Sequence, residues 1–149
     1  MKGFVGHIAD LTVENRNFRH VLYTSAHLQL VVMSLKAGQD IGEEVHPGLD
    51  QFFRIEKGKG KIEIDGKSHK IKAEDAIVVP AGARHNLINT GNKPMKLYTV
   101  YAPPNHLDQL VQATKSEAVA SHEKFAGITT ESKANSKRRI LGAALPRPM

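Results

Sequence analysis

The sequence contains no cysteine in its 149 residues. This absence excludes disulfide bonds, thiolate metal sites, iron–sulfur clusters and a cysteine nucleophile. Any metal ion in this protein must therefore be held by nitrogen and oxygen ligands. The chain also lacks an apolar run long enough to cross a bilayer, and its N-terminus lacks the continuous apolar core of a secretion signal. We therefore expect a cytoplasmic protein without a membrane partner.

Little net charge lies outside the last residues of the chain. The formal charge is +6, and five cationic residues against one acidic residue, Glu131, supply four of those units: Lys133, Lys137, Arg138, Arg139 and Arg147. Neither interleaved aromatic residues nor a groove-reading helix accompanies them, so a nucleic acid is not an expected partner. The length suits one domain with flanking segments.

Residues 21–104 have the pattern of an all-β domain. Apolar residues recur at period two, as at Leu30 and Val32, and short strand-like runs are separated by turn signals. Asp65 and Gly66 form a strong hairpin signal, because a type I′ turn needs positive φ at both central residues. The pattern contains no crossover helix between these strands. We therefore predict one antiparallel β-sandwich or barrel.

Three segments flank this predicted domain. Residues 1–20 are predicted to be an N-terminal extension. Residues 105–125 contain good helix formers, with Leu107 and Leu110 at helical spacing, and this pattern predicts a C-terminal helix. Polar and basic residues dominate residues 126–149, which we expect to form a flexible basic tail.

Four side chains of the predicted barrel are candidates for a metal site. Glu44 and His46 lie two positions apart, so both point to one face of an extended segment. Gln51 follows a Pro-Gly turn that returns the chain, and His85 follows a second turn. Two imidazoles, one carboxylate and one amide oxygen suit a divalent cation such as zinc, iron, manganese or nickel. A cation would also offset the cost of burying the carboxylate.

The spacing of these residues resembles the cupin family. The first cupin motif reads G-x5-H-x-H-x3,4-E-x6-G, and its intervals are reproduced by Gly38, Glu44, His46, Gln51 and Gly58. Glu44 stands where the family has its first histidine, and Gln51 stands where it has glutamate. The carboxylate and a neutral ligand have therefore exchanged places.

The second cupin motif is matched as well. It reads G-x5-P-x-G-x2-H-x3-N, and its later positions are Pro80, Gly82, His85 and Asn89 here. Glu74 replaces the opening glycine, and we expect that departure to change only a turn. Together the two motifs imply a jelly-roll β-barrel, the double-stranded β-helix of the cupins.

The resemblance covers about residues 28–102, and it extends to ligands and assembly. Phosphomannose isomerases, which are cupins, bind zinc through two histidines, one glutamate and one glutamine. The present set is similar to theirs, with acid and amide permuted. Two histidines and one carboxylate also form the ligand set of non-haem iron oxygenases. Small cupins commonly dimerise through edge strands, so we expect a homodimer formed near residues 28–35.

Two functions of different classes fit such a site. The first is a metal-dependent enzyme that acts on a small polar molecule, either an isomerase of mannose-6-phosphate-like sugars or a dioxygenase. The second is a non-catalytic ligand-binding or sensor cupin, in which the metal ion is structural and its coordination is closed. A third, weaker alternative is that the permuted ligands bind no metal.

Three further residues are candidates for contacts with a substrate. Phe53, Arg84 and Tyr101 are candidates for binding the substrate, with a surface role as the competing interpretation for the last two. Glu44 could instead be a solvated acid, and the Gln51 amide could simply bond a neighbouring strand. Spacing identifies no general base. The remaining histidines have no motif, and we expect them at the surface: His7, His20, His27, His69, His106 and His122. His106 carries one reservation, because it leaves the predicted barrel at a turn that could cover the barrel mouth.

Overall fold

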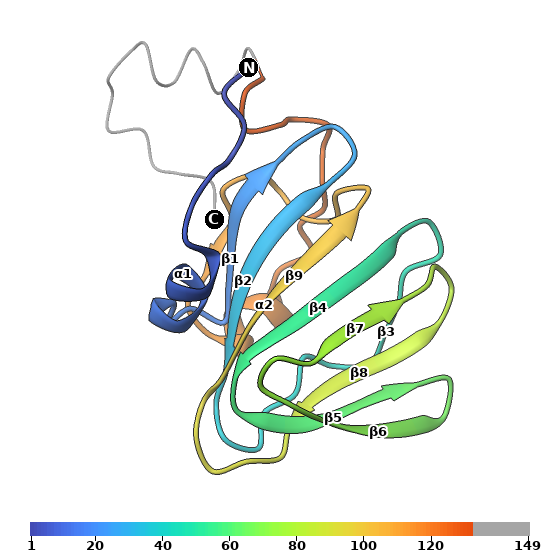
Figure 1. Cartoon of the computed structure of the whole chain (residues 1–149). Helices are drawn as coiled ribbons and strands as arrows, with labels where there is room; N and C mark the ends of the chain where they lie inside the picture. The colour runs from blue at the N-terminus through green and yellow to red at the C-terminus, as the bar shows by residue number, and fades with distance from the viewer. Residues whose placement is uncertain (133–149) are drawn as a thin grey trace.

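The structure is a computed structural model that describes residues 1–132 (Figure 1). Most of the predicted tail at 126–149 therefore lies outside the described residues, from position 133 onward. The elements are α1 (Ile8–Glu14), β1 (Arg19–Thr24), β2 (Gln29–Leu35), β3 (Glu44–Val45), β4 (Asp50–Lys57), β5 (Lys59–Ile64), β6 (Lys67–Lys72), β7 (Ala76–Val79), β8 (Arg84–Asn89), β9 (Met95–Ala102), β10 (Val111–Gln112) and α2 (Lys115–Ala120).

The strands form two antiparallel sheets that face each other (Figure 1). The larger sheet has the order β10-β1-β2-β9-β4-β7, and the smaller sheet has the order β3-β8-β5-β6. Helix α1 packs against β9, β4 and β2 of the larger sheet. This arrangement confirms the predicted all-β jelly roll.

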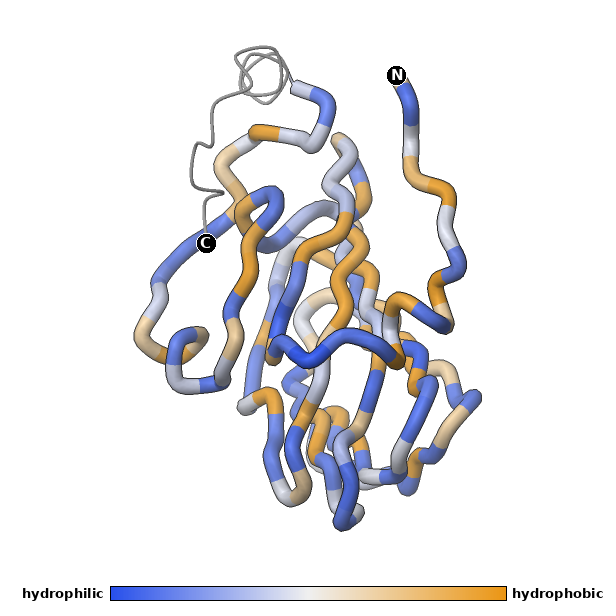
Figure 2. Tube along the Cα trace, turned by 90° about the vertical axis from the view of Figure 1, so that its left-hand side faces the viewer, coloured by the Kyte–Doolittle hydropathy of each residue, from blue (hydrophilic) through white to orange (hydrophobic). Residues whose placement is uncertain are grey.

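The core lies between the two sheets and follows from the period-two pattern. Along β4, Gln51, Phe53 and Ile55 are buried, while the alternate residues are more exposed. Leu87 of β8 and Leu97 of β9 are fully buried as well. Figure 2 shows hydrophobic and hydrophilic residues alternating along the strands. One face of each strand thus supplies the barrel interior.

Turn chemistry fixes the smaller sheet. Asp65 and Gly66 have φ values of 46° and 81° and join β5 to β6, which confirms the predicted hairpin. Gly60 permits a close approach of β5 to its neighbours, because a Cβ at this position would lie 2.1 Å from Ile88 O. Glu74, which replaces the glycine of the family motif, has a φ of 77° and lies in a turn. That departure does affect a turn, as expected.

The C-terminal helix is present but is shorter than predicted for residues 105–125. Helix α2 covers Lys115–Ala120 only, and Thr114 caps its N-terminus by accepting a hydrogen bond from Glu117 N. Leu110 is buried in the core instead, and the two residues after it form β10, which pairs with β1. Pairing with the edge of the larger sheet overrides the helical propensity of this segment.

Two further features of the structure differ from the sequence pattern. The predicted extension at residues 1–20 contributes α1 and the first two residues of β1, so β1 begins earlier than expected. The strand expected to form a dimer edge, residues 28–35, becomes β2, which lies between β1 and β9 inside the larger sheet. It therefore has no free edge for a partner. The homodimer and the domain boundaries stay predictions.

The start of the predicted tail is tied to the barrel. Thr130 N donates a hydrogen bond to Thr24 O at 2.9 Å. Glu131 accepts hydrogen bonds from the backbone N–H groups of residues 2 and 3 and from the hydroxyl of Tyr23. Thr130 thus contacts β1 and Glu131 holds the N-terminal arm, so the described start of the predicted tail is bound to the rest of the chain.

Candidate metal centre

Three neighbouring segments bring the four predicted ligands together. Glu44 of β3 is the direct cross-strand partner of His85 of β8, so their side chains share one face. His46 follows β3, and Gln51 lies on the buried face of β4 after the turn. Strands β3, β4 and β8, with the turn between β3 and β4, therefore bring all four side chains together.

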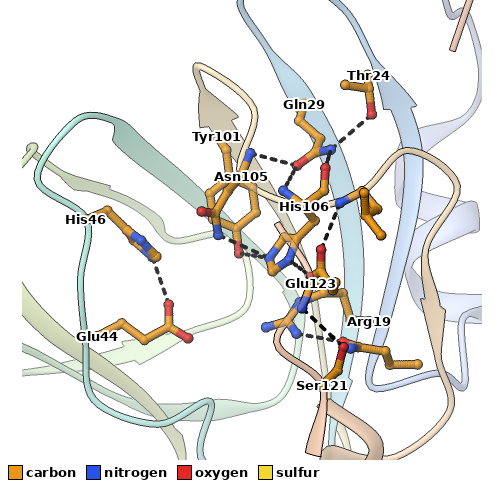
Figure 3. Close-up of polar contacts among 12 residues, drawn as sticks. Arg19, Thr24, Gln29, Glu44, His46, Tyr101, Asn105, His106, Ser121 and Glu123 are labelled. Atoms are coloured by element: carbon orange, nitrogen blue, oxygen red, sulfur yellow. Dashed lines mark hydrogen bonds and ion pairs between the residues drawn. The ribbon is translucent and has the colours of Figure 1, made fainter. Parts of the chain in front are cut away.

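The ligand atoms converge closely enough to hold one ion. The ligand atoms of Glu44, His46 and His85 all lie within 4.8 Å of one another. The closest contact joins His46 Nε2 to Glu44 Oε2 at 2.7 Å (Figure 3). Gln51 Oε1 lies 3.2 Å from His85 Nε2. Two imidazoles, one carboxylate and one amide oxygen thus surround a common point.

The hydrogen bonds around His85 leave the lone pair of its Nε2 directed toward the space between the four candidate ligands. His85 Nδ1 lies 3.1 Å from Ala83 O, and because a carbonyl only accepts, the neutral ring carries its proton on Nδ1. Gln51 donates through Nε2 to Thr99 Oγ1 at 3.0 Å, which turns its oxygen toward His85. Two acceptors, His85 Nε2 and Gln51 Oε1, therefore face each other, as they would around a cation.

His46 supports the same interpretation. Its Nε2 is buried and forms no hydrogen bond of good geometry within residues 1–132, although the Glu44 carboxylate is 2.7 Å away. A short contact with poor hydrogen-bond geometry is expected when both atoms aim at a shared ion rather than at each other. The residues present therefore fit a divalent metal ion.

Electrostatics keep the carboxylate of the set ionised. Burial alone would raise the pKa of Glu44. The close contact with His46, together with the positive charge of Arg19, outweighs burial and holds this pKa below its ordinary value. Glu44 is therefore available as an anionic ligand at neutral pH.

Two of the three predicted substrate-binding residues lie beside the ligand set, and one does not. Phe53 packs edge-on against His85 with ring centroids 6.3 Å apart, and Tyr101 packs edge-on against His46 at 6.0 Å. Arg84 is 64% exposed and pairs with Glu43 on the outer face of β8. Because side chains alternate along a strand, Arg84 points away from the interior when its neighbour His85 points in.

A second polar cluster adjoins the ligand set through Tyr101 (Figure 3). His106 Nε2 lies 3.2 Å from the Tyr101 hydroxyl, and His106 Nδ1 contacts Glu123 Oε1 at 2.5 Å. Burial lowers the pKa of His106 despite the neighbouring Glu123, so the ring is neutral and donates from Nδ1. Burial raises the pKa of Tyr101, which keeps its proton.

The loop that carries His106 is held by one buried amide. Gln29 donates to Thr24 Oγ1 and to His106 O, and its oxygen accepts from the N–H groups of Asn105 and His106. The Gln29 amide thus makes four hydrogen bonds, three of them to the backbone of residues 105 and 106, which tie the loop to β2. This histidine was expected at the surface, and its burial at 8% exposure corrects that expectation.

Sequence reasoning missed two residues near the ligand set, Arg19 and Glu123, and singled out His106 only because its turn could cover the barrel mouth. Arg19 is 5% exposed and follows the inward-facing alternation of β1 with Val21. A basic residue in phase with buried apolar residues was the available signal, but the strand was predicted to begin two residues later. No local sequence pattern indicated a role for Glu123, because its contact with His106 depends on the path of the chain after α2.

The fold and the ligand set define a jelly-roll protein with a candidate metal centre inside one end of its barrel. A sequence model of the cupin domain matches residues 31–101. The uncharacterized protein YrkC of Bacillus subtilis is 49% identical over 129 residues, which cover 82% of this chain and 69% of YrkC. The chain belongs to the cupin superfamily.

Two more relatives extend the comparison. The crystal structure of BH2720 from Bacillus halodurans has a TM-score of 0.79 and 44% identity, and the match covers 80% of this chain and 96% of that one. The polyketide synthase CurC of Streptomyces cyaneus is 25% identical over 80 residues, or 54% of this chain and 51% of CurC. Within residues 1–132, no helix combines the length and apolar character that a membrane span requires.

Proposed function

We propose that this protein is a metal-dependent cupin enzyme, a dioxygenase that adds both atoms of dioxygen to a small polar organic molecule. The observation that carries the proposal is the convergence of Glu44, His46 and His85, with the Gln51 oxygen beside them. Two histidines and one carboxylate are the facial ligand set of non-haem iron oxygenases, which leaves coordination positions open. The similarity to CurC, a polyketide synthase protein, supports an enzyme over a passive binding module.

The residues of the chain divide the work at this centre. Glu44, His46 and His85 would hold the ion, and Gln51 would supply a neutral oxygen donor. The backbone carbonyl of residue 83 fixes the His85 ring through Nδ1. Phe53 and Tyr101 wall the site with aromatic rings that limit access by water. When bound, the ion supplies Lewis-acid and redox chemistry to substrate and dioxygen.

Isomerisation fits the structure less well. Proton transfer in a sugar isomerase needs a general base within hydrogen-bond reach of the substrate. Within residues 1–132, the titratable groups beside the ligand set are Tyr101, which keeps its proton, and the His106–Glu123 pair, whose members bond each other. The absence of an uncommitted base there favours oxygen chemistry.

Elemental analysis of tag-free protein tests the metal site. We expect nearly one divalent ion per chain in the wild-type protein and a large loss in His46→Ala. The matched control is His69→Ala, because His69 is exposed on β6 in the smaller sheet. Equal metal content in wild-type protein and His46→Ala, or no binding even after reconstitution, would overturn the assignment.

A second measurement separates an enzyme from a module with a structural metal. Iron(II)-loaded protein treated anaerobically with nitric oxide should give the electron paramagnetic resonance signal of a high-spin iron nitrosyl, because catalytic sites keep a position open for a small ligand. Protein whose iron spectrum does not change with nitric oxide would have closed coordination. That result would favour the sensor or binding module.

A further inference from the structure

Arg19 is a buried cation whose hydrogen bonds are incompletely satisfied. It is 5% exposed at the start of β1. Its Nη1 donates to Gln112 Oε1 at 2.8 Å, while its Nε has no hydrogen-bond partner within residues 1–132. Its guanidinium carbon lies over the Phe18 ring, 5.2 Å from the ring centroid, so its direct contacts are an aromatic face and a neutral amide. Burying a guanidinium without a carboxylate in direct contact is costly. Such a group is expected where an anionic ligand completes the environment.

The other arginines with described contacts behave differently. Arg84 pairs with Glu43 and Arg54 pairs with Glu56, and both lie nearer the surface. Among the ion pairs within residues 1–132, none involves Arg19. Within residues 1–132, Arg19 is therefore a buried arginine without a carboxylate ion-pair partner.

Arg19 also faces the candidate metal centre. In Figure 3 its guanidinium points toward the carboxylate of Glu44, with Tyr101 between the two polar clusters. The positive charge of Arg19 lies close enough to interact electrostatically with Glu44, Tyr101 and Glu123. The ring of Tyr101 in turn packs edge-on against His46. A ligand that binds the metal ion and extends past Tyr101 would therefore meet the guanidinium.

The balance of charge around this interior favours an anion. A divalent ion and Arg19 bring three positive charges, whereas Glu44 and Glu123 bring two negative ones. One positive charge stays uncompensated inside the barrel, and a bound monoanion would neutralise it.

We propose that Arg19 recognises the substrate and that the substrate is a small organic anion. Its carboxylate, or an equivalent acidic oxygen group, would bind the Arg19 guanidinium, and a second oxygen would bind at the metal centre. This inference rests on the proposed function because the second contact is made there. Arg19 is a specificity residue in this scheme, since a neutral analogue leaves its charge unpaired.

A series of dicarboxylates of increasing length tests this arrangement. Oxalate, malonate, succinate and glutarate are titrated calorimetrically into zinc-loaded protein, each beside its monoamide, which lacks one negative charge. We expect one length to bind at least about tenfold more tightly than its monoamide. Arg19→Gln should remove this difference, while the exposed control Arg84→Gln should keep it. No discrimination at any length by the wild-type protein would overturn the proposal.

Further measurements keep the two proposals separate. Circular dichroism and zinc content show whether Arg19→Gln folds and keeps the metal site, and Arg19→Lys, which preserves the charge but not the planar fork, should bind the preferred dicarboxylate with intermediate affinity. If the wild-type protein holds no metal, the proposed dioxygenase fails. The anion proposal fails with it, because its second contact is made at the metal. If zinc binds but acid and monoamide bind equally, or if Arg19→Gln keeps the difference between them, the anion proposal alone is refuted.

Discussion

Gln51→Glu would restore the acidic residue of the family motif and add a second carboxylate to the candidate metal centre. Gln51 is 3% exposed, and its Oε1 lies 3.2 Å from His85 Nε2. Thr99 can donate to a carboxylate where it now accepts from the amide, so this contact survives. In metal-free protein, however, the new charge is buried beside Glu44 without a cation. We expect the free energy of unfolding of the metal-free protein to fall by about 2 to 4 kcal/mol at about pH 8.

With a divalent ion present, the same substitution should have the opposite effect on binding. The added carboxylate would become a second anionic ligand, and its attraction to the ion offsets the cost of burial. We expect Gln51→Glu to bind zinc at least about tenfold more tightly than the wild-type protein, or about 1.4 kcal/mol in binding free energy. The destabilisation seen without metal should therefore shrink when zinc is saturating.

Differential scanning calorimetry with and without zinc measures both effects. A chain of this size loses about 2 to 4 °C in its unfolding midpoint per kcal/mol, so metal-free Gln51→Glu should unfold about 5 to 15 °C below the wild-type protein. Gln51→Met is the control, because it removes the amide oxygen without adding charge. An unchanged midpoint without metal, together with an unchanged zinc affinity, would show that residue 51 does not face the ligand set and would refute the reasoning.

Two further predictions concern the fold. Gly60→Ala would place a Cβ 2.1 Å from Ile88 O, a backbone atom that cannot rotate away; chemical denaturation should show a loss of about 2 to 3 kcal/mol, against about 0.5 kcal/mol or less for the unobstructed control Gly48→Ala. The hydrogen bond from Tyr23, followed by those from backbone N–H groups, lowers the pKa of Glu131 from 4.5 to about 2. Because the folded-state pKa is the lower one, this contact contributes fully above pH 4.5 and is lost as the pH falls toward about 2. Hydrogen exchange should show that the backbone amides of residues 2 and 3 are protected above pH 4.5 and lose this protection toward about pH 2 in the wild-type protein, but not in Glu131→Gln. Identical pH profiles of the two proteins would contradict the role of Glu131.

Most strands, and the proximity of Glu44, His46 and Gln51 along the chain, could be predicted because their signals are local. Glu44 and His46 share a face by strand alternation, and the turn before Gln51 is encoded by a Pro-Gly pair within the same segment. The alternation of β4 and the Asp-Gly hairpin likewise depend on neighbouring residues only. The pairing of Glu44 with His85 is not local, and it was reached through the two motifs rather than through periodicity.

The features that sequence reasoning missed all depend on pairing between distant segments. The segment around Leu110 has helical spacing, yet it joins the larger sheet because β1 offers an unpaired edge there. Arg19 became buried by the same pairing, since Gln112 of β10 is its cross-strand partner. The His106–Glu123 contact spans a loop and a helix whose course no local pattern specifies. Intrinsic propensity describes each segment, whereas burial of these residues depends on which segments meet.

The exchange of acid and amide relative to the family motif has a physical rationale in the burial of the two positions. The Glu44 side chain is 32% exposed, whereas Gln51 is 3% exposed. A carboxylate is less costly at the more exposed position, and a neutral amide suits the deeper one because Thr99 accepts its N–H. The exchange of acid and amide therefore weakens the match to the family motif but lowers the free-energy cost of burying the ligand set without metal. It also places the carboxylate near the buried guanidinium of Arg19.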